Sequence, residues 1–154
     1  MVITQQFASF FIGDVGFGID VMHVQEVRIA TALTRVPLAA RIVAGLLNLR
    51  GQIVTAIDLR RCLDLSDRPA GQPSLNLILK TDEGCLSLLV DRMGEVLDVA
   101  ETDFERPPQT LRGRSRHAIR GAYRLDTGLL LVLDLERILT GLADARSPLI
   151  VAEV

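Results

Sequence analysis

Acid–base or nucleophilic chemistry in this chain would depend on its two histidines, His23 and His117. His23 forms a His-x-x-Glu pair with Glu26, but a metal site needs further ligands from elsewhere in the chain. His117 follows an arginine-rich stretch that includes Ser115, and no neighbouring acid completes a recognisable triad. We therefore predict no catalytic residue, no bound metal and no cofactor, with His23 facing solvent and His117 in a mobile loop. The alternative is a hydrolase that uses one of them in a cleft.

Cysteine and glycine patterns add no further catalytic site. Cys62 and Cys85 are too few for a disulfide framework and lack metal-ligand spacing, so we expect two buried thiols in a reducing cytosol. Gly13, Gly16 and Gly18 superficially match a phosphate-binding glycine run, but such a loop must open a helix. Here a second strand follows the glycines, which predicts a β-hairpin.

An arginine-rich stretch at residues 112–120 is the strongest signal for a nucleic-acid partner, because small barrels bind single strands through arginines and stacking aromatics. The chain has five Phe, one Tyr and no Trp, however, and its net charge is -2. We therefore predict no nucleic-acid binding and a solvated loop over this stretch. The alternative is a nucleic-acid-binding double barrel. Its contacts would be Arg112, Arg114, Arg116 and Arg120.

The turn formed by Arg50 and Gly51 is the most distinctive candidate for binding. A two-residue turn between short strands usually holds Asn-Gly or Asp-Gly, whereas Arg50 places there a planar cation that can pair with a carboxylate through two hydrogen bonds. Two interpretations follow: Arg50 contacts a partner, or it pairs with a local acid such as Glu26 and braces the fold. Both can hold together, because a braced arginine is preorganised for binding. Val24 is either a core residue or part of the same surface.

The elements that would position these residues are mostly short strands. Residues of alternating polarity predict two hairpins, and apolar residues at helical spacing predict a short helix that carries Val24 and Glu26. Asp58 is placed to cap a second short helix. The predicted hairpins comprise residues 5–12 with 17–21 and 45–49 with 52–57, the helices span 21–28 and 59–65, and a linker spans 66–73.

The second half of the sequence repeats the first. A shift of 69 positions pairs Glu26 with Glu95, and a shift of 76 positions pairs Gly45 with Gly121, each within a run of similar residues. A repeat of about 70 residues is too long for a solenoid unit and suits a small closed barrel. We therefore predict a first barrel at 1–66, a second barrel at 73–142 and a C-terminal tail at 143–154.

The amino-acid composition limits the class of protein further. The chain has 154 residues, of which 49% are apolar and 23% charged, as in a folded globular protein. Residues 129–133 are its longest uninterrupted apolar run, far short of the roughly 18 to 20 residues of a membrane-spanning helix. They lack polar alternation, which predicts a strand buried both inside one barrel and between the two. We expect a cytoplasmic protein without membrane insertion, whose partners recognise surface shape.

In combination these segments resemble the CheW family, the coupling proteins of bacterial chemotaxis. The resemblance covers roughly residues 5–142. Its most specific part is the Asn-Leu-Arg-Gly turn at 48–51 followed, seven residues after Gly51, by Asp-Leu-Arg at 58–60. The other matching segments are 17–27, 33–37, 88–91, 95–96, Gly121 and 129–139.

The resemblance implies an all-β fold of two SH3-like five-stranded β-barrel subdomains packed together, with short helices. It also implies a non-enzymatic adaptor that joins the cytoplasmic tips of chemoreceptors, the methyl-accepting chemotaxis proteins, to the histidine kinase CheA at receptor arrays. A coupling protein of another chemosensory pathway, such as twitching or biofilm formation, is the alternative. By resemblance, receptor contacts fall on Val24, Glu26, Gly45 and Arg50. Contacts with the SH3-like regulatory domain of the kinase fall on Leu33, Arg35 and Gly51.

Overall fold

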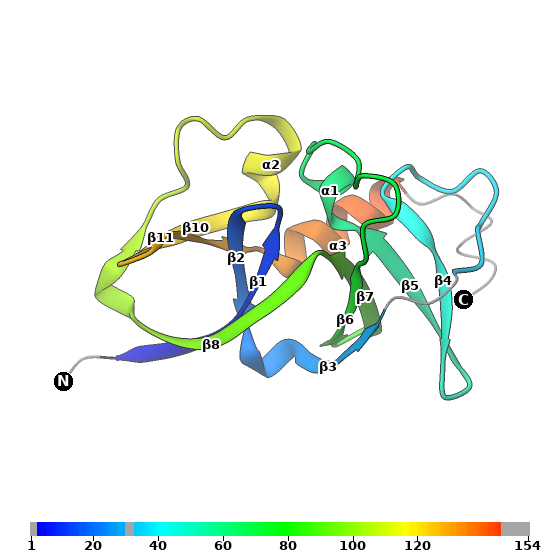
Figure 1. The fold of residues 1–154 in the computed structure, drawn as a ribbon, viewed down its shortest axis with the longest axis horizontal. Helices are drawn as coiled ribbons and strands as arrows, with labels where there is room; N and C mark the ends of the chain where they lie inside the picture. Colours follow the sequence, from blue (N-terminus) through cyan, green and yellow to red (C-terminus); the bar gives the residue numbers. More distant parts are fainter. Residues whose placement is uncertain (1–2, 30–32, 146–154) are drawn as a thin grey trace.

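The computed structural model describes residues 3–29 and 33–145, and it consists mainly of β-strands (Figure 1). No helix in these two ranges is long and apolar enough to cross a membrane. The strands are β1 (Thr4–Ile12), β2 (Val15–Asp20), β3 (Val24–Ile29), β4 (Val43–Leu49), β5 (Gln52–Asp58), β6 (Leu75–Thr81), β7 (Gly84–Val90), β8 (Arg92–Ala100), β9 (Phe104–Glu105), β10 (Ile119–Leu125) and β11 (Gly128–Leu133). The helices are α1 (Leu59–Cys62), α2 (Gly113–Ala118) and α3 (Leu135–Ala145), with 3-10 turns η1 (Val21–His23) and η2 (Glu101–Asp103).

The strands form two sheets. One has six strands in the order β8-β1-β2-β11-β10-β9, and the other has five in the order β3-β6-β7-β5-β4. We call them the six-stranded unit and the five-stranded unit. The sixth strand, β9, is only two residues long. The predicted five-stranded plan is therefore present in both units, with one short strand added to the edge of the first.

The two sheets repeat one plan, with their hairpins exchanged between the halves of the sequence. β1 and β2 form an antiparallel hairpin beside β8, and β2 pairs in parallel with β11. β6 and β7 form the same hairpin beside β3, and β7 pairs in parallel with β5. Each sheet therefore combines a hairpin from one half of the sequence with strands from the other half.

Strand pairing thus crosses the predicted boundary between residues 1–66 and 73–142. Alternating polarity shows where a strand lies and which of its faces is buried, but it does not say which distant strand will be its neighbour. Helix α3 also continues to Ala145, past the predicted end at 142. The division of the chain into barrels at 1–66 and 73–142 therefore stays a prediction, drawn from the repeat in the sequence. Most of the predicted tail, residues 146–154, lies outside the described residues.

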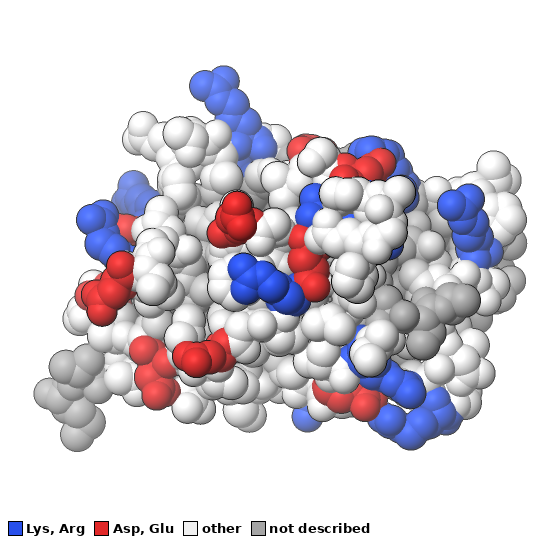
Figure 2. Space-filling view, viewed as in Figure 1, with Lys and Arg blue, Asp and Glu red and all other residues white. Residues whose placement is uncertain are grey.

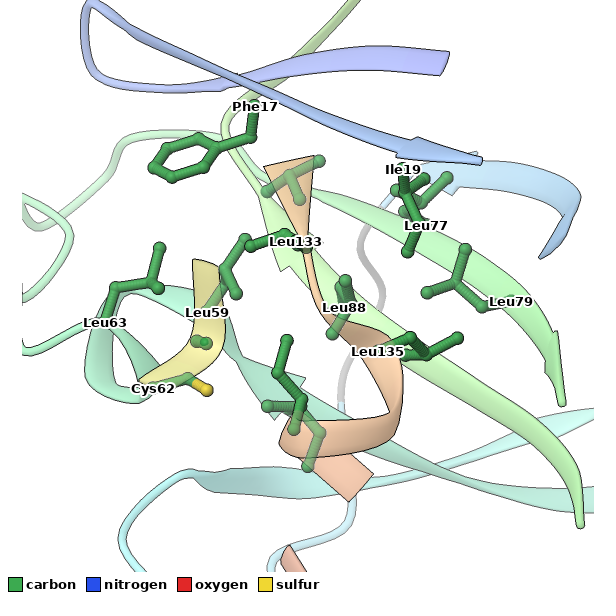
Figure 3. Close-up of a cluster of buried hydrophobic side chains, with 14 of the residues drawn as sticks. Phe17, Ile19, Leu59, Cys62, Leu63, Leu77, Leu79, Leu88, Leu133 and Leu135 are labelled. Atoms are coloured by element: carbon green, nitrogen blue, oxygen red, sulfur yellow. The ribbon is translucent and has the colours of Figure 1, made fainter. Parts of the chain in front are cut away.

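The buried side chains of the described residues form three clusters. The largest, which we call the shared core, takes residues from both units, for example Phe17 of β2 and Leu88 of β7 (Figure 3). Two smaller clusters lie within single units. Burial of apolar surface between the sheets stabilises their packing in the same way as burial within a sheet. The predicted core between the two barrels is confirmed.

Strand β11 contributes to two of these clusters. Leu130 and Val132 belong to the cluster of the six-stranded unit, whereas Leu133 belongs to the shared core. Neighbouring residues of a strand point to opposite faces. The strand is therefore covered on both faces, as its continuous apolar sequence predicts, although its first aliphatic residue, Leu129, is 45% exposed.

The predicted helix over residues 21–28 is wrong. Val21–His23 form a 3-10 turn, and the residues that follow form β3, which pairs with β6. A register shift between Val24 and Glu26 inserts an extra residue into the strand. Because of this bulge, Val24 and Val27 point to the same face of the strand although they are three residues apart. In the sequence, this spacing of apolar residues resembles that of a helix.

A buried ion pair holds the junction of the two units. Arg60 Nη2 of α1 lies 2.6 Å from Asp91 Oδ2, and their side chains are only 12% and 8% exposed. The same carboxylate oxygen accepts a hydrogen bond of 2.6 Å from the Gly13 N–H in the β1–β2 turn. Burial by itself raises the pKa of Asp91, but the hydrogen bonds from Arg60 and Gly13 outweigh it and leave this pKa below its ordinary value.

An aspartate caps each of the helices that follow β5 and β11, as predicted for Asp58. The Asp58 carboxylate accepts a hydrogen bond from the Arg61 N–H at 3.4 Å, and the Asp134 carboxylate accepts one from the Arg137 N–H at 3.1 Å. The loop predicted over the arginine-rich stretch is wrong, because residues 113–118 form α2. Its sequence has no apolar stripe, and the helix is held instead by its contacts with α1 and α3.

Candidate functional site

The Arg50 turn lies at the tip of the β4–β5 hairpin, which projects from the body of the molecule (Figure 1). Arg50 and Gly51 have φ values of 52° and 87°. Positive φ at both positions gives a tight turn whose twist matches the flanking strands. A non-glycine residue reaches this conformation at a cost of roughly 1–2 kcal/mol. The hairpin therefore holds Arg50 in a fixed but unfavourable conformation at its tip.

Asn48 supports this turn, although it is not among the predicted site residues. Its side-chain oxygen accepts a hydrogen bond of 2.8 Å from the Gly51 N–H. The signal was present in the Asn-Leu-Arg-Gly segment, since asparagine side chains commonly bond to the backbone of the turn that follows.

The guanidinium of Arg50 pairs with the carboxylate of Glu26 on β3 through both terminal nitrogens. Nη2 lies 2.7 Å from Oε1 and Nη1 lies 3.4 Å from Oε2. The hydrogen bond from Arg50 lowers the pKa of Glu26, and the same contact raises the pKa of Arg50. The interpretation that Arg50 pairs with Glu26 is confirmed. That Arg50 also contacts a partner stays a prediction.

The pair remains open to solvent. The side chains of Arg50 and Glu26 are 63% and 28% exposed. Arginine has five N–H donors, so two hydrogen bonds to Glu26 leave others available. Two aliphatic side chains of the same unit are also exposed: Val27 of β3 is 41% exposed and Ile53 of β5 is 58% exposed. An oriented, exposed arginine is typical of a protein-binding surface.

Gly45 of β4 lies directly beneath the segment that carries Leu33 and Thr34. A Cβ atom at Gly45 would lie 2.7 Å from the Thr34 carbonyl oxygen and 2.9 Å from the Leu33 Cβ. Thr34 and Leu46 exchange N–H···O hydrogen bonds of 2.9 and 2.8 Å across an isolated β-bridge. Gly45 and Leu33, which the resemblance assigns to different partners, are therefore in contact.

The other residues named by the resemblance occupy two places. Val24 of β3 is half-buried against the shared core, and Gly51 is exposed beside Arg50. Arg35 is exposed and lines a hollow of about 480 Å³ with Arg61 and Arg68, whose lining includes neither Arg50 nor Glu26. The structure thus brings Glu26, Arg50 and Gly51 together and places Arg35 at a different surface.

Among the residues that the structure describes, neither histidine lies in a recognisable catalytic group. His23 is half-buried rather than solvent-facing, with Nδ1 3.2 Å from the Lys80 carbonyl oxygen. His117 is exposed on α2. Within the described ranges 3–29 and 33–145, no group of three or more His, Cys, Asp or Glu residues could hold a metal ion.

The two cysteines differ in burial. Cys62 is 7% exposed, as predicted. Cys85 is half-buried, so the prediction of a buried thiol is wrong there. It lies at the start of β7, next to the β6–β7 turn, and its thiol donates a hydrogen bond of 3.3 Å to the Gln25 side-chain oxygen on β3. Gln25 adjoins Glu26 in the sequence, so this contact lies close to the Arg50 turn.

Charged side chains of both signs are interspersed on the face shown in Figure 2. Arg112, Arg116 and Arg120 are exposed. Figure 2 shows no continuous basic groove on this face of the molecule. A strand of nucleic acid is tracked by such a groove, together with aromatic side chains for stacking. These exposed arginines therefore do not favour the nucleic-acid alternative over a protein-binding surface.

Comparisons with known proteins support one family. A model of the CheW-like domain matches residues 6–143. A chemotaxis protein CheW from Treponema pallidum is 31% identical over 137 residues, which cover 86% of this chain and 81% of the relative. A chemotaxis protein CheW from Helicobacter pylori is 28% identical over 134 residues, with 87% and 81% covered. The crystal structure of the scaffolding protein TtCheW from Thermoanaerobacter tengcongensis is similar in fold, with a TM-score of 0.76 at 23% identity, covering 86% of this chain and 90% of that one.

These matches place the chain in the class of non-covalent coupling adaptors. The family match extends over most of the residues, and this chain belongs to the CheW-like domain family. The predicted fold of two SH3-like subdomains with short helices is confirmed. The chain is a coupling adaptor of chemotaxis.

Proposed function

We propose that this chain binds the cytoplasmic tip of a chemoreceptor through the Arg50 surface, which we define as Val24, Glu26, Gly45 and Arg50. The regulatory domain of the histidine kinase CheA binds beside it, at Leu33, Arg35 and Gly51. The observation that carries the proposal is the exposed pair of hydrogen bonds between Arg50 and Glu26 at the hairpin tip.

The Arg50 surface is suited to bind a polypeptide because its central cation is already oriented. Glu26 holds the guanidinium in place, so less side-chain entropy is lost when a partner arrives. A receptor helix would place apolar side chains near Val24 and Val27 and a hydrogen-bond acceptor near Arg50. Binding of this kind changes no covalent bond and needs no cofactor.

Coupling of the two partners requires that one molecule holds both. Gly45 and Leu33 are in contact, so the residues proposed for the receptor and for the kinase share one support in β4. If each partner favours the same arrangement of this support, each raises the affinity of the other by the same factor. The adaptor would then transmit a change in receptor state as a change in kinase binding.

Replacement of Arg50 by alanine tests the receptor site. Hot-spot arginines cost about 2 kcal/mol or more when truncated, so Arg50→Ala should weaken binding of a receptor-tip fragment roughly 30-fold in calorimetry. The matched control is Arg124→Ala. Arg124 is 74% exposed and pairs with Glu105 at 2.9 Å on the six-stranded unit. Unchanged receptor affinity in Arg50→Ala, or an equal loss in Arg124→Ala, would refute the assignment.

A second variant separates the kinase from the receptor. Arg35 is exposed in a hollow that contains neither Arg50 nor Glu26. Arg35→Glu should therefore weaken binding of the CheA regulatory domain and leave receptor affinity unchanged, both measured on the same preparation. A loss of receptor binding alone would show that the two contact sets are assigned the wrong way round.

A further inference from the structure

The hollow that Arg35 lines is framed by segments far apart in the sequence. They include the segment before β4, the junction of β5 with α1 and the linker after α1. Figure 1 shows the segment before β4 and the linker on the same side of the five-stranded unit. The volume of the hollow is about 480 Å³. Small-molecule sites have volumes of roughly 300–1,000 Å³. We call this site the Arg35 hollow.

Arginines dominate the lining of the Arg35 hollow. Four of them contribute to it: Arg35, Arg41, Arg61 and Arg68. The carboxylates that accompany these arginines are Asp58, which also lines the hollow, and Asp67, which pairs with two of them. Four guanidinium groups and two carboxylates leave an excess of two positive charges.

Two of the four arginines are already paired with these acids. Arg61 Nε lies 3.4 Å from Asp67 Oδ1 and 3.6 Å from Asp58 Oδ2. Arg61 Nη1 also donates a hydrogen bond of 3.2 Å to the Arg41 carbonyl oxygen, and Arg41 Nη2 lies 3.7 Å from Asp67 Oδ1. Both acids are therefore engaged by Arg41 and Arg61, and these contacts fix one wall of the hollow.

The other two arginines carry the excess of positive charge. Arg35 and Arg68 are exposed, and neither forms an ion pair or a side-chain hydrogen bond with another residue that the structure describes. Arg35 precedes β4 and Arg68 lies in the linker, yet both line the same hollow. A guanidinium group binds phosphate oxygens through paired N–H donors. An anion in the hollow would therefore supply the partner that both arginines lack within the described chain.

The base of the hollow is apolar. Val43 and Leu89 line it and are 8% and 9% exposed, and Val36 is half-buried beside them. Three half-buried alanines complete this base: Ala39, Ala40 and Ala44. A ligand whose charged group met the arginines would place the rest of its body on these side chains, where burial of apolar surface stabilises it.

We propose that the Arg35 hollow binds a small phosphate monoester that carries an apolar ring, such as a nucleoside monophosphate. Its phosphate contacts Arg35 and Arg68, and its ring lies on the apolar base. A phosphate monoester has a charge of about −1.5 to −2 at pH 7, which matches the charge excess of the hollow better than the single charge of a carboxylate. A concave site of this volume with an apolar base is typical of small-molecule binding.

Binding of adenosine monophosphate (AMP) tests the site. AMP should bind saturably in calorimetry, and Arg68→Ala should weaken its binding about tenfold, because a hydrogen bond to a charged group contributes about this factor. The matched control is Arg116→Ala, since Arg116 is exposed on α2 and also has no ion-pair partner among the described residues. Absence of saturable binding, or equal losses in the two folded variants, would overturn the proposal.

A series of probes identifies the class of ligand. At constant ionic strength, AMP should bind at least several-fold more tightly than inorganic phosphate, which lacks the ring, and than adenosine, which lacks the charge. A glycine-serine peptide with one phosphoserine serves as the macromolecular alternative. Tighter binding of this peptide than of AMP would overturn the assignment to a small molecule. Equal binding of phosphate and AMP would overturn the role of the apolar base.

Arg35 also links the hollow to the kinase, and this consequence rests on the proposed kinase contact. Because AMP and the CheA regulatory domain would share the Arg35 guanidinium, saturating AMP should weaken kinase-domain binding. Arg68 is outside the proposed kinase contacts. Arg68→Ala should therefore reduce this effect of AMP and leave kinase affinity without AMP unchanged. Equal kinase affinity with and without AMP would overturn the competition, whereas the AMP titration of the adaptor alone tests the hollow independently.

Discussion

Two arginine–carboxylate pairs of almost equal length lie in different regions of this protein. Arg60 and Asp91 are 2.6 Å apart and only 12% and 8% exposed, whereas Arg50 and Glu26 are 2.7 Å apart and 63% and 28% exposed. A charge that loses its partner inside a protein costs several kcal/mol, while an exposed charge regains water. Burial therefore distinguishes the pair that holds the two units together from the pair that is available to a partner.

The internal repeat extends this comparison to the two hairpin tips. The position equivalent to Arg50 is Asp126 in the β10–β11 turn, and the position equivalent to Glu26 is Glu95 on β8. Two carboxylates repel each other and cannot form the pair seen at the other tip. The six-stranded unit thus has the same strand framework without an arginine–carboxylate pair at the equivalent hairpin tip. The framework is duplicated, and the candidate binding surface is not.

Removing the buried carboxylate should have the largest effect on stability. Asp91→Ala leaves Arg60 without its buried counter-charge and the Gly13 N–H without its acceptor. We expect the free energy of unfolding to fall by about 3–5 kcal/mol in urea denaturation at neutral pH. Glu26→Ala, the exposed counterpart, is the control. Similar losses in the two variants would remove the distinction between the pairs.

The ion pair between Arg60 and Asp91 should also contribute to the loss of folding stability at acid pH. Because the pKa of Asp91 is lowered in the folded state, its contribution to stability is present above the unfolded-state pKa of about 3.9 and is lost as pH falls through the lower folded-state value. Denaturation of the parent protein and Asp91→Asn should therefore differ most near neutral pH and converge below about pH 4. A difference that stays constant down to pH 2 would contradict this origin.

Replacing either of the equivalent glycines Gly45 and Gly121 by alanine should destabilise the protein, but only one replacement should weaken binding. A Cβ atom would lie 2.7 Å from the Thr34 carbonyl oxygen at Gly45, where φ is 155°, and would overlap the Phe104 ring and lie 2.6 Å from the Glu105 carbonyl oxygen at Gly121. We expect Gly45→Ala and Gly121→Ala each to lower the free energy of unfolding by about 1–3 kcal/mol. In a pull-down with a receptor-tip fragment, only Gly45→Ala should bind less. Equal receptor binding by both folded variants would argue against a binding role for the five-stranded unit.

Neutralising the exposed pair should have the smallest effect on stability. Glu26→Gln should leave the free energy of unfolding almost unchanged, especially at high salt, because exposed ion pairs are screened. Its receptor affinity should fall nonetheless, since Arg50 loses its oriented partner. The comparison of denaturation midpoints with calorimetric affinities checks both expectations. A loss of several kcal/mol in stability would show that this pair is structural after all.

Much of the local structure was predictable from the residues. The turns at Gly13 and Arg50, the caps Asp58 and Asp134 and the partner Glu26 all depend on the chemistry of individual side chains. The short helix predicted at 21–28 failed because a bulge changes the spacing of apolar residues on a strand. Helix α2 was missed because its sequence has no periodic signal and tertiary contacts hold it.

The sequence by itself determined the hairpins, the repeat and the family, because these depend on short-range residue patterns and their order. Only the tertiary structure decided that β1 and β2 pair with β8 and β11 while β6 and β7 pair with β3 and β5. It also decided that Arg60 is buried and Arg50 exposed. The physical reason is the same in both cases. Strand pairing and burial depend on segments far apart in the chain, and equal side chains acquire different roles from the neighbours that the fold provides.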